Sequence, residues 1–166
     1  MAQGFLARVA LGPAWTRHLM NAWPPFRAAG IRVTRLADDW SAAEVELRAR
    51  LLNRNFVGTH FGGSIFAMAD PFYMILLMRR LGRDYVVWDK AGSVRFLKPG
   101  RGTLTARFEV TPSMVDEAVA ATSGGGKHEP TYAVEITDER GDVVARVEKT
   151  LHIRRADTPR PALVRA

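Results

Sequence analysis

The chain has 166 residues, of which 47% are apolar and 25% are charged, and it has no cysteine. This composition is typical of one globular domain and excludes disulfides, thiolate metal sites and a cysteine nucleophile. The net charge of +7 belongs to the ends, because residues 1–35 contribute +5 and residues 153–166 contribute +3, which leaves −1 between them. We therefore expect no nucleic-acid partner. The absence of cysteine and of a secretory signal pattern predicts a cytoplasmic protein.

The first predicted element is a helix over about residues 13–23. Pro13 can begin a helix at its first turn, and two prolines after Trp23 end it. Four large side chains recur every fourth residue and would share one apolar face. They are Leu11, Trp15, Leu19 and Trp23.

Six segments alternate apolar and polar residues, which is typical of antiparallel strands with one buried face. They lie at about 31–34, 43–50, 93–96, 103–110, 132–137 and 143–153. Short polar links predict hairpins between the first and second, the third and fourth, and the fifth and sixth strands. A short helix from Ser113 to Ala121, capped by Ser113, is predicted before the fifth strand.

The central element is a helix over about residues 62–81, which is apolar on every side up to Met78 apart from Ser64 and Asp70. Such a helix must be covered by protein or by lipid. An aspartate near the middle of a membrane span costs about 3 kcal/mol, so we expect protein to cover it. Burial of Asp70 then needs a functional reason, and Pro71 is expected to kink the helix beside it.

These elements together predict an α+β fold, in which a curved antiparallel sheet of about six strands wraps around one long central helix, with an added N-terminal helix. Their order resembles the hotdog fold. Residues 1–155 are expected to form a single hotdog domain, and residues 156–166 a flexible basic tail.

The segment from Asn55 to Asp70 resembles the signature of the phenylacetate-pathway type of hotdog acyl-CoA thioesterases. Asn55, Gly62, Gly63 and Asp70 match that signature in type and spacing. Segments at 95–102 and 141–145 are similar to the last strands of the family, so the resemblance spans about 31–153. The chain also resembles related branches of the superfamily that are described as domains of unknown function.

The resemblance implies a role for each matched residue. Asp70 would be the general base or nucleophile, the Gly62 N–H would donate to the oxyanion, and Asn55 would orient water or the carbonyl. Gly62 and Asp70 lie about 12 Å apart along one helix, which is too far for both to reach one carbonyl. The family solution is a homodimer or a dimer of dimers with the site at the interface, acting on an acyl-CoA substrate.

Coenzyme A would enter only as part of the substrate, and no other cofactor is expected. The four histidines show no ligand spacing, so no metal is expected either. Seven further residues are candidates for substrate contact, although single charged loop residues are more often solvated. They are His60, Phe61, Gly63, Asp89, Lys90, Lys98 and Arg101.

The chain departs from the family pattern at two positions. Phe61 stands where the family has its histidine, with His60 one residue earlier, and Asp89 stands where relatives often have serine or threonine. Lys90 has the same alternating position as Val94 and Phe96, so it is expected to face inward unless Gly92 forms a bulge that changes the register. These departures leave two functions open: hydrolysis of an acyl thioester, and non-catalytic binding of an acyl-CoA or lipid.

Overall fold

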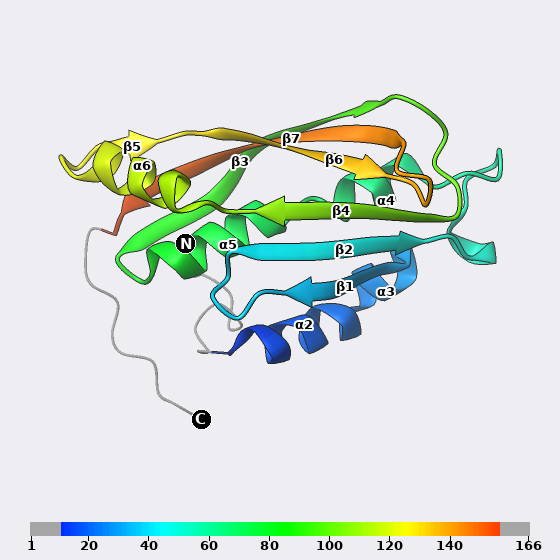
Figure 1. Ribbon diagram of the computed structural model, residues 1–166, viewed down its shortest axis with the longest axis horizontal. Helices are drawn as coiled ribbons and strands as arrows, with labels where there is room; N and C mark the ends of the chain where they lie inside the picture. The colour runs from blue at the N-terminus through cyan, green and yellow to red at the C-terminus, as the bar shows by residue number, and fades with distance from the viewer. Residues whose placement is uncertain (1–10, 157–166) are drawn as a thin grey trace.

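The computed structural model describes residues 11–156, and the layout is a curved antiparallel sheet with helices on its concave side and along one edge (Figure 1). The helices are α2 (Pro13–Ala22), α3 (Pro24–Ala29), α4 (Gly62–Ala67), α5 (Phe72–Leu81) and α6 (Pro112–Thr122), with a 3-10 turn at Leu51–Asn53. The strands are β1 (Ile31–Leu36), β2 (Ala42–Arg48), β3 (Tyr85–Phe96), β4 (Thr103–Glu109), β5 (Lys127–His128), β6 (Thr131–Thr137) and β7 (Val143–Arg155).

The strands lie in the order β1-β2-β4-β6-β7-β3, and the two-residue β5 pairs with β7. The predicted hairpins β1–β2 and β6–β7 are confirmed by their antiparallel registers. The hairpin predicted for residues 93–96 and 103–110 is wrong, because β3 pairs with β7 while β4 lies between β2 and β6. A short polar link permits a hairpin but does not require one, and here it carries the chain to another part of the sheet.

The core lies between α5 and the concave face of the sheet. Phe72, Leu76 and Leu77 of α5 are fully buried, and the Phe72 ring stacks on Phe108 of β4 at 4.9 Å between centroids. The alternating apolar residues of the strands supply the opposite wall, which is the burial that stabilises this layer arrangement.

The central helix differs from the prediction, because it is divided into α4 and α5. The backbone tightens at the break: the Ala69 N–H donates to Phe66 O at 3.0 Å and the Asp70 N–H to Ala67 O at 3.3 Å. Pro71 has no N–H to continue the helix and its ring blocks the preceding turn, so the expected kink becomes a full break. Among the residues that the structure describes, no helix is long and apolar enough to cross a membrane.

Three local boundaries also differ from the prediction. Strand β3 begins at Tyr85 and is 12 residues long. Its bulge lies at Lys90 rather than Gly92, because Asp89 faces Leu151 while Ala91 faces the adjacent Thr150. Helix α6 is capped by Thr111, whose Oγ1 accepts from the Met114 N–H, and not by Ser113.

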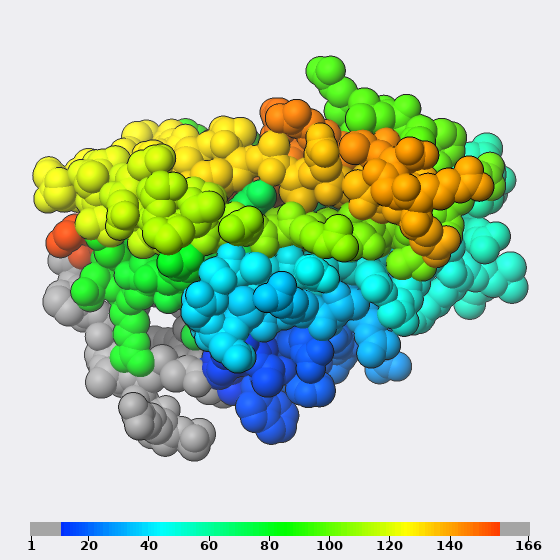
Figure 2. Space-filling view, in the orientation of Figure 1, coloured from blue at the N-terminus to red at the C-terminus, as the bar shows by residue number. Residues whose placement is uncertain are grey.

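The N-terminal helix is placed along the edge of the sheet, beside β1, and it has no buried residue. Its predicted apolar face is turned outward, and Figure 2 shows α2 in blue on the lower edge of the molecule. The expected basic tail lies, from residue 157 onward, outside the described residues.

Candidate functional site

Asp70 lies at the break between α4 and α5. Its side chain is 51% exposed, so the prediction that this carboxylate is buried in the helix is wrong for the single chain. The cause is the break itself, since the tight turn before Pro71 directs residue 70 away from the core while its neighbours Ala69 and Phe72 remain buried. The carboxylate is thus accessible to a molecule that approaches this surface.

A buried lysine joins Asp70 to Asp89. Lys149 of β7 is only 2% exposed. Its Nζ donates to Asp70 Oδ1 at 2.6 Å and lies 3.2 Å from Asp89 Oδ1. The charge of the lysine is therefore offset by two carboxylates, as a buried charge requires.

Gly92 makes room for this lysine. It lies opposite Lys149 in the β3–β7 register. A Cβ atom on Gly92 would lie 3.2 Å from Lys149 Cδ and 2.9 Å from Cζ of Phe66. The lysine stem and the ring thus occupy the space that a side chain at Gly92 would fill, and Lys149 Nζ lies 5.3 Å from the centroid of the Phe66 ring.

Burial and two charged neighbours together determine the pKa of Asp89. Burial raises the pKa of Asp89 above its ordinary value, the nearby Lys149 lowers it, and the negative charge of Asp70 raises it again, with a net upward shift. Asp89 therefore keeps its proton to a higher pH than an ordinary aspartate does.

The start of α4 carries the two glycines of the motif. At Gly62 a Cβ would lie 2.9 Å from the Phe96 ring, and at Gly63 it would lie 2.3 Å from the Phe61 ring. Both glycines are thus explained by aromatic rings of the same chain packed against them. Because α4 has only six residues, its contribution to anion binding would come from free N–H groups and not from a long helix dipole.

Asn55 shapes the loop before α4. Its Oδ1 accepts from the Val57 and Thr59 N–H groups at 3.1 and 3.0 Å. Its Nδ2 donates to Thr59 Oγ1 at 2.8 Å and to His60 O at 3.2 Å. The amide makes four bonds within its own loop, so the geometry gives Asn55 a role in positioning that loop.

His60 is buried and anchors the same loop to the β3–β4 connection. Its Nε2 lies 2.9 Å from Gly102 O, and its backbone N–H donates to Gly100 O at 3.0 Å. A carbonyl oxygen only accepts, so Nε2 carries the proton. Burial lowers the pKa of His60, which favours the neutral ring.

The predicted cationic contacts are placed on the surface. The inward orientation predicted for Lys90 is wrong, because it is the extra residue of the β3 bulge and its Nζ binds Glu129. Lys98 binds Asp138 and Asp142 at 2.8 and 2.7 Å, so its charge is already offset. Arg101 is exposed, and no ion pair is found for it in residues 11–156.

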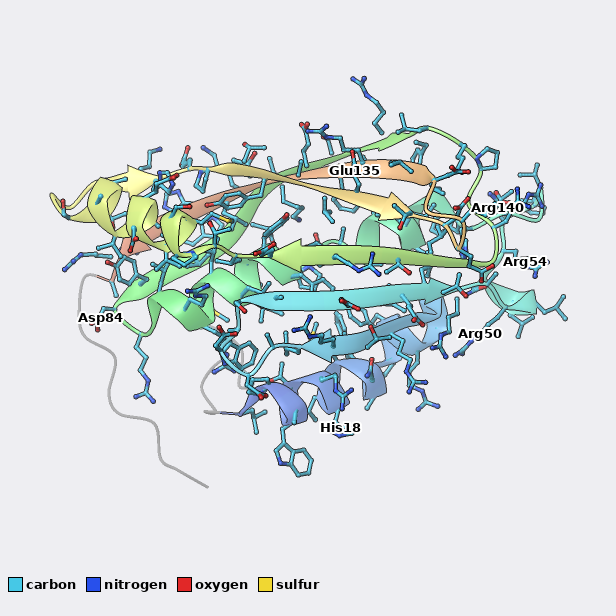
Figure 3. The ribbon with its side chains drawn as sticks, in the orientation of Figure 1. His18, Arg50, Arg54, Asp84, Glu135 and Arg140 are labelled. Carbon is cyan, nitrogen blue, oxygen red and sulfur yellow. The ribbon has the colours of Figure 1, made fainter. Side chains whose placement is uncertain are left out.

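A cleft of about 540 Å³ opens beside the start of α4. Its lining is mainly apolar, with Arg54 as its charged member, and Figure 3 shows Arg54 at the end of the molecule where the loops gather. The lining residues are Ala28, Ala29, Leu52, Asn53, Arg54, Asn55, Phe56, Phe61 and Ser64.

Sequence reasoning identified Asp70 and Asp89 but missed Lys149, which joins them. The sequence did contain a signal, because Lys149 has the alternating position of Val147, Leu151 and Ile153, which face inward on the last strand. A lysine in such a set needs a buried partner. Within the described residues no group of three or more His, Asp or Glu side chains could hold a metal ion.

Comparisons with known proteins identify the family and the fold of the chain. The family model described as "Domain of unknown function (DUF4442)" matches residues 13–153. No curated protein matches the chain.

The chain is similar to a Pseudomonas aeruginosa protein of unknown function that is described as a probable thioesterase, with a TM-score of 0.79, 20% identity, and 90% of this chain and 99% of that one covered. A thioesterase from Haemophilus influenzae has a TM-score of 0.64 and 14% identity, with coverage of 91% and 96%. The E. coli PaaI protein from the phenylacetic acid degradation operon has a TM-score of 0.60 and 22% identity, with coverage of 89% and 96%. These likenesses confirm the predicted hotdog fold.

Proposed function

The chain belongs to the DUF4442 family, and we propose that it hydrolyses an acyl thioester, with an acyl-CoA as the expected substrate. The observation that carries the proposal is the accessible Asp70 carboxylate, held at 2.6 Å by buried Lys149 beside strand β3. An exposed aspartate on a helix end has no need of a buried cation. A carboxylate that is held in one place on an accessible surface has an evident use as a base.

In the proposed reaction Asp70 takes a proton from water, and the oxygen of that water attacks the thioester carbonyl. The carbonyl becomes an oxyanion, which receives a hydrogen bond from the Gly62 N–H of a second copy of the chain. Collapse of this intermediate breaks the C–S bond and releases the acid and the thiol, with the proton passing from Asp70 to the thiolate. In the alternative mechanism Asp70 attacks the carbonyl itself and displaces the thiolate, which forms a mixed anhydride. Water then hydrolyses this anhydride, which releases the acid, regenerates the Asp70 carboxylate and supplies the proton for the thiolate.

A homodimer would bring these groups together, and three observations favour pairing at β3. This strand forms one end of the sheet and is 12 residues long. The opposite end, β1, is covered by α2. Large exposed apolar side chains gather near the end of β3 and the start of α4, as expected of an interface; they include Phe61, Phe96 and Leu97.

The cleft beside α4 would take part of the substrate. Its apolar lining suits an acyl chain or the pantetheine arm, and Arg54 would attract the phosphates of coenzyme A. Asn55 and His60 would act by holding the loop that forms one wall, because their polar atoms are used within the protein.

The test is Asp70→Asn in steady-state assays with acyl-CoAs of several chain lengths. We expect kcat to fall about 100-fold or more, because the base is lost, while the melting temperature stays close to that of the native protein. Asp84→Asn is the matched control: Asp84 is an exposed aspartate at the far end of α5 (Figure 3) and should leave kcat unchanged. Undiminished turnover in Asp70→Asn would refute the proposal.

One observation favours the alternative of non-catalytic acyl-CoA binding. The Lys149 ammonium already occupies Asp70 Oδ1, so this oxygen is engaged within the protein and only Oδ2 is left to contact water or substrate. Isothermal titration with the same acyl-CoAs separates the two functions. The alternative predicts binding to both the native protein and Asp70→Asn, with turnover by neither.

A further inference from the structure

Helix α2 packs on the protein through Met20 and several polar side chains. Asn21 Nδ2 donates to Val33 O at 3.0 Å, and the Val33 N–H donates to Asn21 Oδ1 at 2.8 Å. Arg17 Nη1 donates to Thr34 O at 3.1 Å. These bonds satisfy the free edge of β1, which would otherwise be open to pairing.

The apolar side of α2 is therefore turned toward solvent. Trp15 is 67% exposed and Trp23 is 52% exposed. Leu19 lies between them, and His18 shares the same outward side, as Figure 3 shows. A surface helix normally has the reverse orientation, with its apolar residues on the core. The prediction of one apolar face on this helix is correct in pattern, but that face does not meet the core.

The proposed dimer leaves this face uncovered. Strands β1 and β3 are the two ends of the sheet, and α2 lies along β1. A second copy that pairs at β3 would lie at the opposite edge. The surface needs a separate partner, because Trp15 and Leu19 on α2 and Trp23 directly after it expose a large apolar area to water.

The charge of this region identifies the chemistry of the partner. The first 35 residues contain five arginines and no acidic residue, and the first acid is Asp38. Arg27 and Arg32, which follow α2 in the sequence, are both exposed. Tryptophan and leucine on one side with arginines nearby are typical of helices that lie in the interface of an anionic membrane.

We propose that the apolar surface formed by Trp15 and Leu19 of α2, and continued by Trp23 directly after the helix, binds a membrane that contains anionic lipids. The tryptophans enter the headgroup region, and the exposed Arg27 and Arg32 attract the lipid phosphates. This binding is peripheral and does not depend on the reaction proposed above.

Sedimentation with lipid vesicles tests the proposal. Full-length protein is mixed with vesicles of phosphatidylcholine that contain about 30% phosphatidylglycerol, and with vesicles of phosphatidylcholine alone. We expect binding to the anionic vesicles, and at least about threefold weaker binding when NaCl is raised from about 0.1 M to about 0.5 M. Trp15→Ser should weaken the partition coefficient about tenfold, which corresponds to the loss of about 1.4 kcal/mol.

The matched pair of variants is Leu19→Ser and Val119→Ser, because both side chains are 38% exposed but Val119 lies on α6. Only Leu19→Ser should weaken binding. The proposal is overturned if the native protein does not sediment with anionic vesicles, or if Trp15→Ser binds as strongly as the native protein. It is also overturned if the apolar face mediates concentration-dependent self-association without vesicle binding.

Acrylamide quenching shows whether another part of the chain covers the face. The difference in emission between the native protein and Trp15→Ser reports on Trp15. Strong quenching without vesicles and weaker quenching with anionic vesicles supports the proposal, whereas protection of Trp15 in the absence of vesicles overturns it.

Discussion

Replacement of Lys149 by methionine tests the electrostatics of the candidate site directly. Methionine keeps most of the stem that packs against Phe66, and it removes the ammonium that contacts Asp70 and Asp89. Removal of one partner from a fully buried ion pair costs about 3–5 kcal/mol. Asp70 is half exposed and Asp89 is partly exposed, so solvent compensates part of the loss and we expect about 2 kcal/mol. For a chain of this length the melting temperature should fall by about 4–8 °C.

The pH dependence separates a loss of charge from a loss of packing. The pKa of Asp89 is already raised in the folded protein, and without Lys149 it should rise further. A carboxyl with a higher pKa in the folded chain binds more protons when folded, so its contribution to stability decreases as pH rises through that value. The deficit of Lys149→Met should therefore be largest near pH 7.5 and at most about half as large near pH 4.5.

Urea unfolding at the two pH values measures this deficit. Lys90→Met removes an exposed lysine that binds Glu129, and it should change stability by less than about 0.5 kcal/mol. Without Lys149, the carboxylates of Asp70 and Asp89 repel each other. The double variant Lys149→Met with Asp89→Asn removes this repulsion and should restore about half of the lost stability. Equal deficits at both pH values, or no rescue by Asp89→Asn, would refute the reasoning.

Two further predictions concern residues that position the site. Gly92→Val should lower the free energy of unfolding by about 1–3 kcal/mol, because the valine side chain would meet Phe66 and the stem of Lys149. Ala91→Val is the control: Ala91 is the exposed neighbour, and its replacement should leave urea unfolding nearly unchanged. Burial lowers the pKa of His60 from its ordinary 6.5, so the contribution of His60 to stability is complete above pH 6.5 and decreases as pH falls below it. Between about pH 7.5 and pH 5, the melting temperature of His60→Gln should therefore decrease less than that of the native protein. An identical decrease in both proteins would contradict this role.

Local patterns predicted the elements better than their arrangement. Alternation of apolar residues identified the strands because each strand has one buried face, whichever neighbour it pairs with. The place of β3 at the end of the sheet depends on contacts with β7, whose paired residues lie 49 to 70 positions later in the chain, and a short link gave no information about it. In the same way the spacing of Trp15 and Trp23 predicted an apolar face on the first helix but not the direction of that face.

For the candidate site too, the sequence pointed to single residues but not to their arrangement in space. The motif around Gly62 located Asp70 on the central helix, and the comparison with family positions singled out Asp89. Their common partner Lys149 comes from a distant strand, so only the folded chain brings the three together. The break at Pro71 also could not be read in advance, because a proline inside a helix can either bend it or end it.

The close packing of Gly92, Phe66 and Lys149 constrains how this charge arrangement can vary among relatives. A residue with a β-carbon opposite the lysine would displace its stem, and a smaller residue in place of the ring would leave a gap beside it. The three positions should therefore change as a unit, and a relative that lacks the glycine is expected to have a different electrostatic environment around its aspartate.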